Sequence, residues 1–289
     1  MRYVRQPGAP LAERIQWAPV SGRSFTFRVE AGLPLLEAVR RGFASAGFKS
    51  GVLRATAGAL EPFAYVMPAL SKTGEHAAFY SDTFRPAGTT FLTAMAMTLG
   101  LRDDAAFFHC HALWHQADGT MLGGHILPEE TYVAEPFDVQ AFGIEGAKFV
   151  AEHDTETNFR LFGPKFSAAG PASSAARAFA LRLRPNQDLT TALEQFCRSQ
   201  GFASAIVHGG VGSIIGARFT DGRRVDPFVT EMAIRSGEIA PDPNGAPRAK
   251  LDVVLVDHTG GTAEGVLLRG DNPVLMTMEL VLEPLSIRL

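Results

Sequence analysis

Four histidines gather in one short stretch of this sequence, at His109, His111, His115 and His125. A strand places alternate side chains on the same face, so the first three share one face and Cys110 lies on the other. Neutral imidazole is a ligand suited to Zn²⁺, with Ni, Fe and Cu as alternatives. The pattern therefore indicates metal chemistry.

A hairpin would complete such a site. Ala117-Asp118-Gly119 is typical of a three-residue hairpin loop with glycine in the left-handed position. This loop pairs Gln116 with Thr120 and places His111 opposite His125. Directly opposed Cβ atoms lie ~4.5–5.5 Å apart and diagonal ones ~7–8 Å, so three imidazoles can meet on one ion. Three protein ligands leave a position open for water, as in catalytic zinc sites.

The predicted metal ligands are therefore His109, His111 and His125. The alternative is that these histidines are ordinary core or surface residues. His115 would pair with Met121, further along the hairpin, and is expected either beside the metal ligands without touching the metal or in solvent. Glu129 or Glu135, shortly after the hairpin, is a candidate general base beside a metal-bound water. The sequence identifies no other candidate catalytic residue.

The elements that position these residues occur twice. Phe25–Val29 alternates like a strand, as does Phe179–Leu183, 154 residues later. Each is followed by an amphipathic helical segment that ends at Gly-Phe and then by a β-rich run. This order predicts an α+β fold of two tandem domains, each a mostly antiparallel or mixed sheet with one packed helix.

The predicted boundaries follow from this repeat. An N-terminal arm covers residues 1–21, and it either packs on a neighbour or hangs free. The first domain, with the three histidines, covers 22–150. A linker covers 151–175, where the run of small residues from Ser167 to Ala176 is broken by Gly and Pro. The second domain covers 176–289.

The second domain is expected to carry no histidine site. Gly119-Thr120 matches Gly261-Thr262, 142 residues later, and this spacing aligns the three histidines with Leu251, Val253 and Leu267. Aliphatic side chains cannot hold a metal. We therefore expect the second copy to be retained for packing.

The run His-x-His, followed by Asp-Gly-x-x-x-Gly-Gly-His, resembles the signature of the plants-and-prokaryotes conserved (PPC) domain. The resemblance covers roughly residues 22–145 well and 176–285 more weakly. It implies a compact α+β domain that forms homotrimers and, in several prokaryotic members, holds zinc through the residues that correspond to His109, His111 and His125. The fold implied is also similar to acetolactate decarboxylase and a zinc-dependent ester hydrolase. Plant members carry an AT-hook before the domain, and this chain has no Arg-Gly-Arg-Pro segment.

The composition argues against several classes of protein. The chain has 289 residues, a net charge of −3 and two cysteines. This balance gives no strong positive field for DNA, so DNA is an unexpected partner for the isolated chain. Two cysteines do not form a disulfide scaffold, and no apolar run approaches the ~20 residues that cross a membrane. A cytoplasmic protein is expected, because no signal peptide is recognised.

Two functions are compatible with these features. The first is a PPC-domain protein with one divalent-metal site, zinc foremost, that catalyses metal-assisted hydrolysis or decarboxylation of a small carbonyl compound. The second is a DNA-associated regulator or a metal-stabilised scaffold without catalysis. The sequence leaves open whether the chain is an enzyme and predicts a homo-oligomer, a trimer by resemblance, with a small-molecule ligand in the enzyme case.

Overall fold

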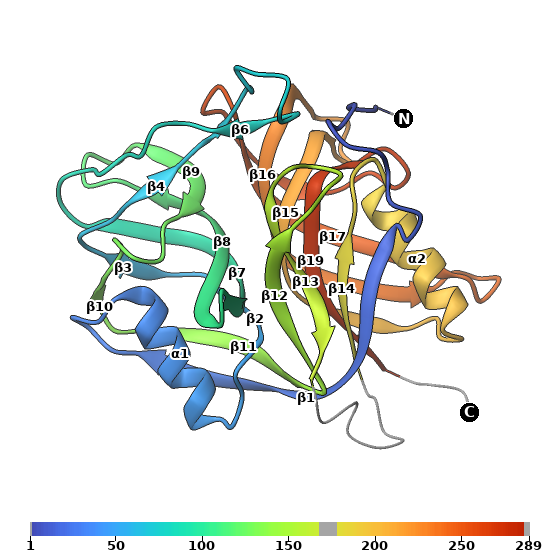
Figure 1. Ribbon diagram of the computed structural model, residues 1–289, viewed down its shortest axis with the longest axis horizontal. Helices are drawn as coiled ribbons and strands as arrows, with labels where there is room; N and C mark the ends of the chain where they lie inside the picture. The colour runs from blue at the N-terminus through green and yellow to red at the C-terminus, as the bar shows by residue number, and fades with distance from the viewer. Residues whose placement is uncertain (1, 168–177, 286–289) are drawn as a thin grey trace.

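The computed structural model describes residues 2–167 and 178–285 (Figure 1). The first half contains one helix and thirteen strands, counted over the described residues: β1 (Ile15–Val29), α1 (Leu35–Ser45), β2 (Gly51–Ala55), β3 (Gly58–Leu60), β4 (Tyr65–Val66), β5 (Pro68–Ala69), β6 (Phe79–Tyr80), β7 (Thr90–Arg102), β8 (Ala105–His115), β9 (Met121–Ile126), β10 (Val133–Glu135), β11 (Phe137–Glu145), β12 (Ala147–His153) and β13 (Arg160–Phe166). The second half contains β14 (Ala178–Leu183), α2 (Leu189–Ser199), β15 (Ala205–Arg218), β16 (Arg224–Pro241), β17 (Pro247–Asp257), β18 (Thr262–Val266) and β19 (Val274–Pro284).

The two halves have the same strand order. In the first half the strands pair in the order β1-β11-β2-β7-β8-β9, and in the second half in the order β14-β19-β15-β16-β17-β18. All these pairs are antiparallel, and β12 adds a short parallel contact to β7. The mostly antiparallel sheet with one helix per half agrees with the predicted α+β class.

Strand β1 belongs to both sheets. Residues 15–20 pair with β14 of the second half, and residues 21–29 pair with β11 of the first. The chain before β1 also lies against the second half, where the Val4 N–H donates to Asn186 Oδ1 and Gln6 Nε2 donates to the Leu275 carbonyl. The predicted arm therefore packs within its own chain, and its last residues form a strand.

The inner sheet faces pack against each other, with α1 and α2 on opposite outer sides (Figure 1). Ala94, Ala96 and Leu113 of the first sheet meet Ala233 and Val254 of the second. Alanines on this face let the two sheets approach closely. The odd-numbered face of β8, which carries His109 and His111, therefore lies between the two halves.

Each helix covers the outer face of its sheet because of its apolar stripe. In α2, Leu189, Leu193 and Phe196 are buried against the sheet. The Asp188 carboxylate accepts from the Thr191 N–H at 2.8 Å and caps the start of this helix. Gly201, with a φ of +78°, follows the end of the helix, as the Gly-Phe motif predicts.

The turns that join β8 to β9 and β17 to β18 are alike. In each, a backbone N–H donates to the carbonyl four residues later, from Gln116 to Thr120 and from Asp257 to Gly261. The left-handed glycine is Gly119 in the first turn, with φ +85°, and Gly260 in the second, with φ +87°. Equivalent residues are therefore 141 positions apart. The spacing of 142 that the Gly-Thr motif predicted is wrong by one.

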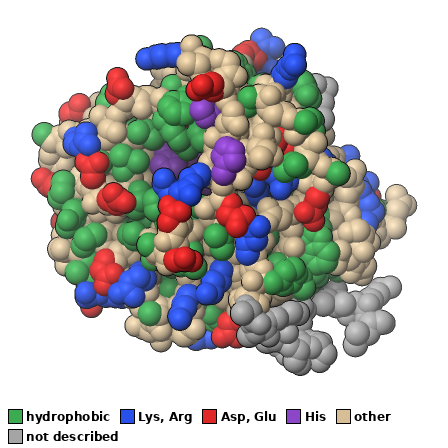
Figure 2. Space-filling model, viewed as in Figure 1, with side chains coloured by type: hydrophobic (Ala, Val, Ile, Leu, Met, Phe, Trp, Pro, Cys, Tyr) green, Lys and Arg blue, Asp and Glu red, His purple; other side chains and the backbone are tan. Residues whose placement is uncertain are grey.

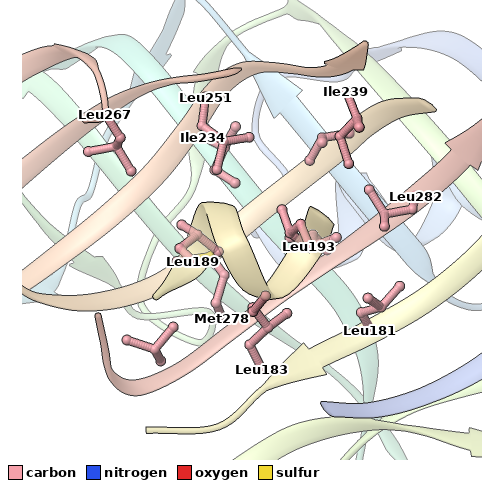
Figure 3. Close-up of a cluster of buried hydrophobic side chains, with 14 of the residues drawn as sticks. Leu181, Leu183, Leu189, Leu193, Ile234, Ile239, Leu251, Leu267, Met278 and Leu282 are labelled. Atoms are coloured by element: carbon pink, nitrogen blue, oxygen red, sulfur yellow. The ribbon is translucent and has the colours of Figure 1, made fainter. Parts of the chain in front are cut away.

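A slip of one residue moves a strand side chain to the other face of the sheet. The positions equivalent to the three histidines are Lys250, Asp252 and Val266. The residues expected there, Leu251, Val253 and Leu267, lie in the core against α2 (Figure 3 labels two of them). The second half thus lacks histidines at these positions, as expected, but only one of the three residues there, Val266, is aliphatic.

The predicted linker is partly folded. Ala151–His153 completes β12, and Arg160–Phe166 forms β13, which pairs with β12 along its whole length. Residues 151–153 and 160–166 therefore belong to the sheet of the first half, and residues 168–177 lie outside the described part of the chain. Neither helix within residues 2–167 and 178–285 is long and apolar enough to cross a membrane.

Candidate metal centre

The β8–β9 hairpin brings three imidazoles together as predicted. His111 lies opposite His125 in the ladder. His109 Nε2 lies 3.1 Å from His111 Nε2, and His125 Nδ1 lies 3.3 Å from the same atom. One nitrogen from each ring lies within 4.8 Å of the other two, a separation at which the three can hold a metal ion.

A carboxylate from the second half fixes the orientation of His109. Glu279 of β19 is fully buried, and its Oε2 lies 2.9 Å from His109 Nδ1. Arg182 stands directly across from Glu279 in the β14–β19 ladder. A carboxylate oxygen accepts hydrogen bonds, so His109 Nδ1 donates in this contact and Nε2 presents a lone pair.

The second half also fixes His111. Its Nδ1 lies 3.2 Å from the carbonyl oxygen of Met232 in β16, and a carbonyl oxygen only accepts. Nδ1 therefore donates, and Nε2 presents a lone pair. The facing Nε2 atoms of His109 and His111 are then both acceptors, 3.1 Å apart. Only a cation or an added proton between them relieves this repulsion.

The surroundings favour the neutral form of His111 and of His125. Removal from water lowers the pKa of His111 well below its ordinary value, and the neighbouring His109 and His125 add to this effect. The pKa of His125 is lowered well below its ordinary value, first by removal from water and then by His109. Neutral imidazole is the form that binds a metal. The donor set therefore fits a divalent transition metal.

Glu231 of β16 is a second buried carboxyl group beside the histidines. Its Oε1 lies 3.6 Å from His111 Nε2, and its Oε2 has no hydrogen-bond partner among the described residues. Burial raises the pKa of Glu231 well above its usual range. Tyr80 of β6 closes the other side, with its ring 5.2 Å from that of His125, and burial raises the pKa of its hydroxyl.

The buried carboxyl groups Glu231 and Glu279 are not the two glutamates predicted from the sequence as candidate general bases. Glu129 and Glu135 are both exposed, and neither lines the pocket beside the histidines. His115 lies outside the group, with Nδ1 at 3.2 Å from the Gly119 carbonyl oxygen. Cys110 is buried on the α1 side of the sheet, as its strand parity predicts.

The sequence does contain one indication of the two buried glutamates beside the histidines. Glu231 and Glu279 each stand inside an apolar strand, in VTEMAI and MTMELV. Glutamate is almost never fully buried unless it has a partner. A glutamate inside each of two buried strands therefore indicates a partner elsewhere, although only the fold shows that the partners are these histidines.

A small pocket opens onto His109 and His111, with a cavity volume of about 40 Å³. Both halves contribute to it. The first half supplies Phe79, Tyr80 and Phe159, and the second half supplies Glu231 and Leu275. The histidines thus lie at the junction of the two halves and next to a space that a small molecule can enter.

One family model matches part of the chain. Residues 170–286 match the model of the Plants and Prokaryotes Conserved (PCC) domain. This is the half in which we expected the weaker resemblance, and the assignment of the first half stays a prediction. No curated protein matches the chain by sequence.

Two solved structures are similar to about half of the chain. One is a plant- and prokaryote-conserved protein from Pyrococcus horikoshii, with 18% identity, 50% of this chain and 93% of that chain covered, and a TM-score of 0.39. The other is a metal-containing protein from Archaeoglobus fulgidus, with 18% identity, 49% and 93% covered, and a TM-score of 0.39. By the family match, this chain carries a Plants and Prokaryotes Conserved domain at residues 170–286.

Proposed function

We propose that the chain binds one divalent transition metal, with zinc foremost, through His109, His111 and His125. We further propose that this centre catalyses hydrolysis or decarboxylation of a small carbonyl compound. The observation that carries the proposal is the pair of Nε2 acceptors that face each other at 3.1 Å. Each outer nitrogen is held by the second half, by Glu279 for His109 and by a carbonyl for His111, as is usual for metal-binding histidines.

A bound divalent metal would polarise a carbonyl oxygen or lower the pKa of a bound water to about 7. The protein would supply the remaining functions. Glu279 would keep His109 in one tautomer, and Glu231 Oε2 is free to exchange a hydrogen bond with a molecule in the pocket. The apolar wall around Phe159 and Leu275 would exclude water from the reacting group.

Chelation tests this function. Protein stripped of metal and then reloaded with zinc is assayed against small esters, lactones, amides and 2-hydroxy-3-oxo acids. Activity that disappears on stripping and returns with zinc is expected, because the metal is the group that would polarise the carbonyl or activate the water. Protein that binds zinc tightly but converts none of these compounds would instead support the metal-stabilised scaffold.

The domain assignment belongs to the same proposal. We propose two PPC-type domains, with the histidine site in the first and a domain without this site in the second, and the shared strand order supports this division. The homotrimer stays a prediction, which light scattering of the purified protein tests. A stable monomer would contradict it.

Tight binding of duplex DNA by this chain is not expected. The net charge is −3, and acidic and basic side chains are interspersed on the face shown in Figure 2. Specific DNA-binding proteins reach ~10⁻⁸–10⁻¹¹ M at physiological salt. Fluorescence anisotropy with a random duplex should show no binding in this range. A salt-sensitive nanomolar transition would overturn the prediction and favour a DNA-associated regulator.

A further inference from the structure

Much of the wall of the pocket beside the histidines is apolar. Among its lining residues, Phe79, Phe159, Leu161, Val229 and Leu275 present apolar side chains. These residues come from both halves, and the last three are buried. A molecule whose polar end reaches the histidines would therefore have an apolar surface around the rest of its length.

The charged and titratable groups at this pocket are few. Among the residues that line it, all within the described part of the chain, there is no lysine or arginine. The groups present are His109, His111, Tyr80 and Glu231. The nearby Arg182 is not a lining residue, and its guanidinium donates to Asp154 at 2.8 Å. A second anionic group on a ligand would find no cation there.

The polar contacts are concentrated at the inner end. The imidazole nitrogens of His109 and His111 meet there, and the buried Glu231 Oε2 has no partner among the described residues. A buried unpaired carboxyl oxygen costs free energy, so a ligand with an N–H or O–H at this end would satisfy it. The cavity volume of about 40 Å³ has room for roughly three water molecules, which restricts the ligand to a short chain.

We propose that this pocket takes a small uncharged molecule with one metal-binding polar end and a short apolar tail, and that it rejects molecules with a second anionic group. This inference rests on the proposed function, because the polar end meets the metal centre. It favours neutral esters or amides over compounds that carry a separate carboxylate, and so it favours hydrolysis over decarboxylation.

Two hydroxamic acids of matched length test this inference. Butyrohydroxamic acid has an apolar tail, and succinic acid monohydroxamate has a carboxylate at the same place. Each is titrated into the cobalt-loaded protein, and the visible cobalt spectrum reports binding. The neutral compound is expected to bind at least about tenfold more tightly, because a buried carboxylate without a partner is costly.

A substitution at the pocket mouth provides the matched control. Phe79 is 46% exposed, so a change there can be made without disturbing the core. Phe79→Lys should improve binding of the carboxylate compound and so reduce the preference for the neutral compound. Phe79→Leu should leave this preference unchanged. A wild-type preference for the carboxylate compound, equal binding of both, or a spectrum that neither compound changes would overturn this inference alone. Protein that takes up no cobalt would overturn the proposed function and this inference with it.

Discussion

Replacement of His111 by alanine is expected to abolish stoichiometric metal binding. Wild-type protein purified with zinc present should contain one transition-metal ion per chain, and the His111→Ala variant should contain almost none. His111 Nε2 is the atom nearest to both other ligand nitrogens, at 3.1 and 3.3 Å, so its removal leaves two ligands that no longer share a centre. Elemental analysis of both proteins measures the effect.

Two further variants test whether the loss of metal is specific to the three proposed ligands. His115→Ala removes a histidine on the same strand that lies outside the group, and its metal content should equal that of the wild type. Glu279→Gln keeps the shape but weakens the hold on His109 Nδ1, and metal affinity should fall by about 10–100-fold. Wild-type protein without metal after zinc-rich purification would contradict the site, and so would full metal content in His111→Ala.

Replacement of Val253 by aspartate is expected to destabilise the protein by at least about 3 kcal/mol. Val253 is fully buried in the core that packs against α2, where a carboxylate has no partner. Urea unfolding measures the free energy of unfolding. Because β16 and β19 of the same half hold Met232 and Glu279, loss of this core should also weaken metal binding.

The matched control introduces the same charge on the surface. Thr262→Asp lies on β18, next to β17, and its side chain is exposed. Its free energy of unfolding should differ from that of the wild type by less than about 0.5 kcal/mol. A Val253→Asp protein as stable as this control would show that the second half does not depend on its core as described.

The part of the site that could be predicted from sequence is local. The loop around Gly119 sets the register of β8 and β9, and this register alone brings His111 opposite His125. Strand parity likewise places Cys110 on the far face. Both inferences use only the residue-by-residue geometry of a hairpin, which does not depend on the rest of the fold.

The part that could not be predicted depends on contacts between distant segments. Glu279 meets His109 across 170 residues, and only the packing of one sheet on the other brings them together. The Gly-Thr motif placed the equivalent positions of the second half one residue too far along the chain. Gly260 and Gly261 are adjacent, and only backbone geometry shows which one turns the chain. Motif matching cannot distinguish two neighbouring glycines.

The path of β1 also determines how this chain can be divided. Its first six residues, Ile15–Val20, cover the side of β14 that β19 does not pair with. A protein that began at residue 178 would therefore expose β14 as an open sheet edge, with Phe179, Leu181 and Leu183 along it. Such apolar edges recruit other strands and lead to aggregation. We therefore expect that the two halves do not fold independently, so they should be expressed and studied as one chain.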